Sequence, residues 1–169
     1  MGAIDKAKIE LIQGDAAKGV PLAQYNLGLM YLTGKGMPKD CAKAVEWYTK
    51  AAEQGDVVAQ YALYSIFWRG YGVQRDLGKA IEWLTMAANA GHVRAQSDLG
   101  ALYLGGRGVP KNTTLAYAWL SLASIYGYRH WLHSINSFLA KHGLTKDESI
   151  ETHRTVMRWL KKRREQAKS

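Results

Sequence analysis

The stretch that decides the fold is Gln24-Tyr25-Asn26-Leu27-Gly28-Leu29-Met30-Tyr31-Leu32-Thr33-Gly34-Lys35-Gly36. Its pattern returns twice more, each time 36 residues further along the chain. The repeated positions hold the same or similar residues: Leu27, Leu63 and Leu99; Tyr31, Phe67 and Tyr103; Gly34, Gly70 and Gly106; Gly36, Gly72 and Gly108. A fixed period of this length is the sequence signature of a stacked helical solenoid.

The second half of each unit is equally regular. Small residues recur at the positions of Ala44, Ala51 and Ala52, which lie on one face of a helix. Side chains that cap helix N-termini recur before that helix, as Asp40, Asp76 and Asn112. A tryptophan recurs within it, and we expect this set to supply the large buried area of each unit: Trp47, Trp83 and Trp119.

These patterns predict an all-α, right-handed α-solenoid of antiparallel helix pairs, about nine helices in all, with the first helix of each pair inside. Residues 1–169 then form a single array. We expect a leading helix over 1–19, repeats over 20–55, 56–91 and 92–127, and C-terminal capping helices over 128–169. The last helix is predicted to begin with a capping box formed by Thr145 and Glu148.

Catalytic and metal-binding patterns are missing from the sequence. No carboxylate or cysteine stands at metal-ligand spacing around the five histidines, and neither a G-x-S-x-G elbow nor a phosphate-binding G-x-x-x-x-G-K-[ST] loop occurs. The sequence therefore predicts no catalytic residue, no metal, no cofactor and no enzymatic activity. The lone Cys41 excludes an intramolecular disulfide. No apolar run is long enough for a signal peptide or a membrane span, so we expect the cytoplasm, or the periplasm if a signal peptide has been removed.

Positive charge gathers at the C-terminus. The chain has a net charge of +9, and residues 153–169 alone carry seven Lys or Arg against one acidic residue. Such a tail would attract an acidic partner, nucleic acid or an anionic surface, while a solvated terminal helix that keeps the array soluble is the simpler interpretation. The tail residues singled out are Arg158, Lys161, Lys162, Arg163 and Arg164.

The repeated unit resembles the Sel-one-like repeats, relatives of the tetratricopeptide repeats with a longer, glycine-bearing loop between the helices. The similarity rests on Ala-x-Tyr-x-Leu-Gly-x-x-Tyr-x-x-Gly-x-Gly followed by Asp-x-x-Lys-Ala-x-x-Trp-Tyr-x-Lys-Ala-Ala-x-x-Gly, carried by residues 23 to 55. Three such units cover 20–127. Tyr64 departs from the pattern, because the other two units have glycine at this position of the first helix. The distance between the two helices of the second unit is therefore an open question.

The resemblance implies a scaffold that binds a partner protein or peptide on its concave face, in envelope assembly, secretion, infection or toxin immunity. We include acidic proteins among the expected partners. Binding of nucleic acid by the basic tail is the less favoured alternative. We expect a monomer without a membrane span. The concave face would be formed by first-helix positions that vary between repeats. We assign to it Leu22, Tyr25, Leu29, Tyr61, Ser65, Trp68, Arg69, Arg94, Ser97 and Ala101. Of these, Trp68 and Arg69 are the expected anchors.

Overall fold

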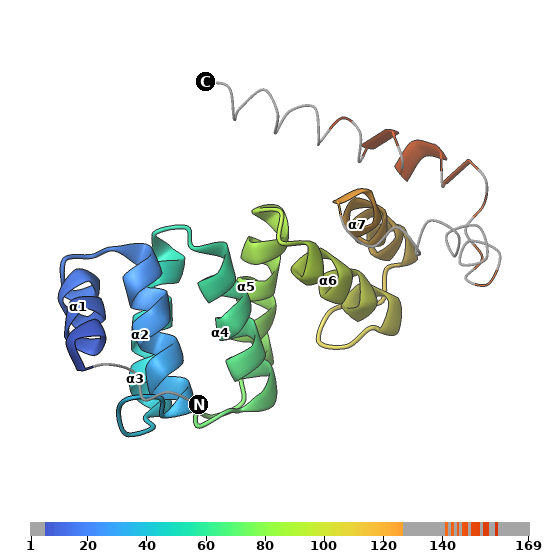
Figure 1. Ribbon diagram of the computed structural model, residues 1–169. Helices are drawn as coiled ribbons and strands as arrows, with labels where there is room; N and C mark the ends of the chain where they lie inside the picture. Colours follow the sequence, from blue (N-terminus) through green and yellow to red (C-terminus); the bar gives the residue numbers. More distant parts are fainter. Residues whose placement is uncertain are drawn as a thin grey trace. The chain divides into compact units, whose positions relative to one another are not determined.

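The computed structural model describes residues 6–126 and, beyond them, residues 141, 143, 145, 147, 148, 150–152, 154, 155 and 158. Over residues 6–126 the chain forms helices and no strand (Figure 1): α1 (Lys6–Ala17), α2 (Pro21–Thr33), α3 (Cys41–Glu53), α4 (Val57–Arg69), α5 (Leu77–Asn89), α6 (Val93–Gly105) and α7 (Thr113–Tyr126). Equivalent helices begin 36 residues apart, so the predicted all-α solenoid of helix pairs is confirmed. The remaining capping helices lie largely outside the described residues.

The chain divides into two compact units, Met1–His92 and Val93–Ser169. In the first unit α1 packs on α2, α2 on α3, α3 on α4 and α4 on α5. In the second unit α6 packs on α7. Within each unit, helices that are consecutive in the sequence therefore contact one another, as expected for a repeat array in which neighbouring elements share an apolar face.

The core of the first unit consists of small residues around one large side chain per second helix. On α3 these small residues are Ala44, Ala51 and Ala52, each at most 1% exposed. Tyr48, at 1% exposure, fills the space between them and α4. Equivalent second-helix positions are equally buried: Leu84 is 0% and Leu120 is 5% exposed.

The prediction that the tryptophans supply the buried area of each unit is wrong in its emphasis. Trp47, Trp83 and Trp119 are only half-buried. The tryptophan precedes the buried residue by one position, and one residue rotates the side chain by about 100° around the helix, to the edge of the packed face. The ammonium of Lys50 lies 4.1 Å from the centre of the Trp47 ring, so this face of the indole is covered by a cation instead of the core.

Turns and caps follow the predicted chemistry. Both loop glycines of the first repeat have positive φ angles, 72° for Gly34 and 82° for Gly36, a backbone conformation that favours glycine. The predicted N-caps also form: the backbone N–H of Lys43 donates to Asp40 Oδ1 at 3.0 Å, and equivalent bonds join Lys79 to Asp76 and Leu115 to Asn112. This hydrogen bond lowers the pKa of Asp40.

A buried glutamine connects each repeat of the first unit to the helix before it. Gln24 Nε2 donates to the carbonyl of Ala16 at 3.3 Å, and Gln60 Nε2 donates to the carbonyl of Ala52 at 3.1 Å. The last carbonyls of a helix lack partners within the helix. These two accept the N–H groups of Gly19 and Gly55, and each glutamine adds a second hydrogen bond from the next repeat. Since Ala16 stands where Ala52 does, α1 replaces a second helix, as predicted for the leading segment.

The two glutamines differ in whether their side-chain oxygen accepts a hydrogen bond, and this difference gives a test of what the bond contributes to stability. Gln54 Nε2 donates to Gln24 Oε1 at 2.7 Å, whereas Gln60 Oε1 is buried and has no hydrogen-bond partner among the described residues. Ala90 is the counterpart of Gln54 in the next repeat. We expect Ala90→Gln to raise the free energy of unfolding by about 1 kcal/mol by supplying the missing donor.

Urea denaturation measures this effect, with Gln54→Ala as the matched change of opposite sign. If Ala90→Gln left the midpoint unchanged while Gln54→Ala lowered it, the buried oxygen of Gln60 would have to be satisfied by water.

Candidate functional site

An open groove of about 410 Å³ runs along the first unit between α2 and α4. Tyr48 of α3 forms its floor, and Tyr71 of the loop after α4 closes one end. The side chains that form it are mostly apolar or aromatic: Tyr25, Leu29, Leu32, Thr33, Tyr48, Ala62, Ser65, Ile66, Arg69 and Tyr71. A concave, largely apolar surface with few polar groups is typical of a binding site.

The α2 wall of the groove includes two of the residues assigned to the concave face, Tyr25 and Leu29. Leu32 and Thr33 also contribute to it. Leu22 was assigned to the concave face too, but it lies outside the groove and is 63% exposed. The groove therefore includes the later turns of α2, while Leu22 of the first turn faces solvent.

The α4 wall differs from the predicted one. Ser65 and Arg69 of the predicted set line it, together with Ala62 and Ile66, which sequence reasoning missed. These four positions form one stripe at helical spacing. The groove lies between the first helices of two consecutive repeats. The α2 wall is the side of α2 that faces the next repeat, and the α4 wall is the side of α4 that faces the previous repeat. Repeat positions that line the groove on α2 therefore differ from those that line it on α4.

Trp68 and Tyr61 do not line this groove, and the anchor role expected for Trp68 stays a prediction. They belong to a second stripe of α4, an aromatic row in which Tyr64 lies 5.6 Å from Tyr61 and 5.9 Å from Trp68 between ring centres. The Tyr61 ring also stacks on His92 at 4.6 Å. Tyr64, which replaces the repeat glycine, directs its ring into this row, and α4 still packs on α5.

Arg69 provides the only formal charge of the groove lining. Its side chain is exposed, and no carboxylate stands among the lining residues. On the floor, the rings of Tyr25 and Tyr48 are 5.5 Å apart. Burial, and secondarily the nearby Tyr25, raise the pKa of Tyr48, so its hydroxyl stays neutral at physiological pH. The groove is thus an uncharged trough with one cation at its end.

The polar groups of the groove are not arranged for catalysis. Thr33 Oγ1 donates to the Leu29 carbonyl at 2.7 Å, and Ser65 Oγ donates to the Tyr61 carbonyl at 3.2 Å. Both hydroxyls are therefore bonded to their own helices, and the lining holds no imidazole, carboxylate or thiol that would activate them. In the part of the chain that the structure describes, no three His, Cys, Asp or Glu residues are grouped to hold a metal ion.

The remaining predicted positions of the concave face lie on α6 in the second unit. Arg94 and Ala101 are exposed and Ser97 is half-buried. They share one side of that helix by their spacing. Their contribution to a binding surface stays a prediction.

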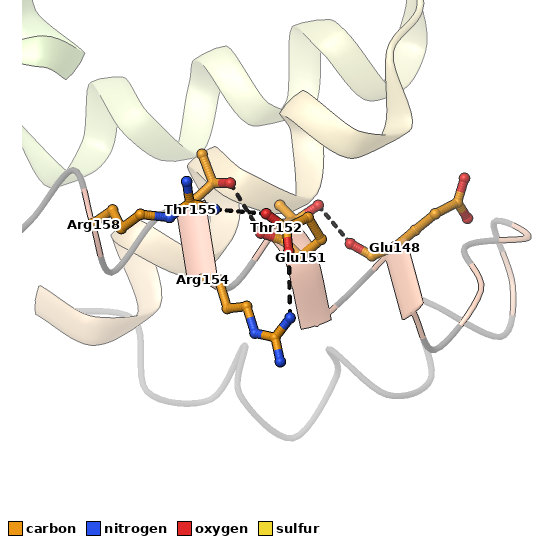
Figure 2. A network of polar contacts seen from close by, with 6 residues as sticks. All are labelled: Glu148, Glu151, Thr152, Arg154, Thr155 and Arg158. Carbon is orange, nitrogen blue, oxygen red and sulfur yellow. Dashed lines mark hydrogen bonds and ion pairs between the residues drawn. The ribbon is translucent and has the colours of Figure 1, made fainter.

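The C-terminal helix is described in part, and its basic residues are partly neutralised. Figure 2 shows Glu151 between two arginines: Arg158 contacts one carboxylate oxygen at 2.6 Å and Arg154 the other at 3.5 Å. The predicted capping box forms at its start, where the Glu148 N–H donates to Thr145 Oγ1 and the Thr145 N–H donates to Glu148 Oε2. Of the predicted tail cations, Lys161, Lys162, Arg163 and Arg164 lie outside the described residues.

Helix pairs at a 36-residue period and a groove between consecutive first helices define the chain as an α-solenoid repeat protein. Comparison with family models gives the particular family, since the Sel1 repeat matches residues 21–56, 57–92 and 93–125. These segments cover more than half of the chain, which therefore belongs to the Sel1 repeat family. Proteins of this family are generally scaffolds for protein interactions.

Solved structures with the same fold include a Sel1 repeat protein from Oxalobacter formigenes, 30% identical with a TM-score of 0.71 over 83% of this chain and 59% of that protein. A second is a protective antigen present in uropathogenic Escherichia coli strains that displays an SLR fold, 28% identical with a TM-score of 0.78 over 96% of this chain and 34% of that one.

Among curated proteins, a sel1-like repeat-containing protein of Acanthamoeba polyphaga mimivirus is 46% identical over 41 residues, 24% of this chain and 7% of the relative. The chain thus spans less than two thirds of the length of each of these relatives. Among the described residues, none of the helices has the length and apolar character needed to cross a bilayer.

Proposed function

We propose that this protein is a non-enzymatic scaffold that binds a segment of a partner protein in the groove between α2 and α4. The observation that carries this proposal is the groove itself, a preformed apolar trough on a surface of the first unit. Its walls are helices of consecutive repeats, and its floor is a side chain of the core, so the shape does not depend on a flexible loop. Bacterial envelope, secretion or toxin-immunity systems are the settings we propose for such a scaffold.

The aromatic lining supports binding to a protein segment over binding to nucleic acid. Tyrosine side chains present large rigid surfaces at low entropic cost, and Tyr25 and Tyr71 supply two of them. A nucleic-acid site would need a continuous track of cations, whereas the lining contains one arginine. The small Ala62 and Ser65 leave room between the walls for a partner side chain.

The proposal is tested with peptides selected from a displayed random library on the immobilised protein. Leu29 lines the groove and is 39% exposed, so Leu29→Ser removes apolar contact area without opening the core. We expect this change to weaken the selected peptides about tenfold in fluorescence anisotropy titrations, the loss of roughly one buried apolar side chain. Leu22→Ser is the matched control, because Leu22 lies on the same helix outside the lining.

Circular dichroism establishes that both variants keep their helices. The proposal would be overturned if the library yielded no specific peptide, or if the Leu29→Ser and Leu22→Ser variants bound the selected peptides equally well.

A further inference from the structure

The end of the groove next to Arg69 opens at a basic edge of the first unit. Two loops join first to second helices there, residues 34–39 and 70–75, and they carry Lys35, Lys39 and Arg75 without any acidic residue. The acidic caps that follow, Asp40 and Asp76, are each paired with a lysine three residues on, at 3.6 and 3.8 Å. The loop edge therefore keeps a positive balance.

Two of the cations stand at the groove mouth. Arg69 is the lining cation, and it makes no ion pair with any residue that the structure describes. Lys39 places its ammonium 5.6 Å from the centre of the Tyr71 ring, and Tyr71 also lines the groove. By contrast, Arg75 is engaged elsewhere, since its Nε donates to the Trp68 carbonyl at 3.1 Å.

The partial negative charge of the helix C-termini at this end does not cancel these cations. Loop N–H groups already bond the last carbonyls: Gly34 donates to Met30, Tyr71 to Ile66 and Asp40 to Tyr31, at 2.9 to 3.0 Å. A helix end counts for about half an elementary charge and is screened within a turn. The formal charges of Arg69 and Lys39 therefore set the sign of the field at the mouth.

The other end of the groove is neutral and aromatic. Tyr25 and Tyr48 form it, with Leu29 beside them. Tyr25 and Thr33 mark the two ends on α2 and are eight residues apart, which corresponds to about 12 Å along a helix. An extended segment covers this distance in roughly three to four residues.

We infer that the groove takes a partner segment in one orientation, with a large apolar side chain against Tyr25 and Tyr48 and an Asp or Glu at the mouth against Arg69. This inference rests on the proposed function and adds the chemistry of the partner. The chain's own C-terminus does not fit, because residues 153–169 carry seven basic residues against one acidic residue and would be repelled at the mouth.

The test compares library selections on the wild-type protein and on the Arg69→Glu variant. The wild-type protein should enrich peptides with an acidic residue three to four positions from a large apolar one. The Arg69→Glu variant should enrich Lys or Arg at the acidic position. A wild-type peptide should bind this variant about tenfold more weakly, because attraction becomes repulsion, and its affinity should fall with added salt.

Lys8→Glu is the matched control, since it makes the same change of net charge on α1 outside the groove. If both variants lost the same affinity, the effect would come from the net charge of the protein, and the proposed ion pair between Arg69 and the peptide would be overturned. Peptides that depend on Leu29 but carry no acidic residue, and that tolerate Arg69→Glu, would overturn the inference and leave the proposed function standing.

If no selected peptide needed Leu29 for binding, the proposed function itself would be overturned. Self-association in analytical ultracentrifugation that disappears in the Leu29→Ser variant would assign the groove to a second copy of the chain, and would also overturn the inference.

Discussion

Replacing Tyr48 with alanine is expected to lower the free energy of unfolding by about 3 to 5 kcal/mol, the cost of removing a large aromatic side chain from a core. The Tyr48 side chain is 1% exposed and packs in the cluster that joins α3 to α4. Its ring also lies against Gly28 of α2. The truncation would therefore leave a cavity bordered by three helices, which urea denaturation followed by circular dichroism should register.

Trp47→Ala is the informative comparison, because the larger residue is expected to matter less. Trp47 is half-buried and covered by Lys50, so we expect a loss of about 1 to 2 kcal/mol, smaller than the cost at Tyr48. If Trp47→Ala lowered the free energy of unfolding more than Tyr48→Ala, the tryptophans would be the main source of core stability.

Gly28→Ala is expected to destabilise the protein by about 1 to 3 kcal/mol, the usual cost of adding a group to a packed interior. A Cβ on Gly28 would lie 3.0 Å from Tyr48 Cδ1 and 3.2 Å from the Ala44 carbonyl oxygen. The ring can shift, but the carbonyl belongs to the backbone of α3, so the two helices would have to separate. Gly100 meets Leu120 in the same way, at 2.8 Å.

Gly14→Ala is the matched control within the first unit. Gly14 lies inside α1, and a Cβ there would meet no atom within 4 Å. Alanine is the better helix former by about 0.5 to 1 kcal/mol, so this change should stabilise the protein. Urea midpoints that rise for both substitutions would contradict the close contact between α2 and α3.

The period predicted the helix pairs and their caps, because those positions are constrained in the same way in every repeat. Asp40 and its equivalents must cap a helix, and the loop glycines must adopt positive φ angles. Comparison of repeats found the tryptophans for the same reason, since their identity recurs. It gave less weight to the next position, where tyrosine in the first repeat, Tyr48, is replaced by leucine in the other two, although all three side chains are at most 5% exposed.

The groove was only half predictable for a geometric reason. Two variable positions of α2 that were assigned to the concave face, Tyr25 and Leu29, line the groove. The same register on α4 pointed to Tyr61 and Trp68, which lie on its other side, while Ala62 and Ile66 escaped notice as ordinary small or core residues. Which stripe of a helix borders a groove depends on the neighbouring helix, and a pattern read one helix at a time does not contain that information.

The glutamine bonds between repeats bear on how such an array grows during evolution. Gln24 and Gln60 reach back eight residues to Ala16 and Ala52, so each of these two repeats brings its own donor to a carbonyl of the helix before it. Tandem duplication of a whole unit reproduces this junction without compensating substitutions elsewhere. An insertion within the eight residues from Ala52 to Gln60 would separate donor from acceptor, whereas duplication of a whole unit keeps their spacing.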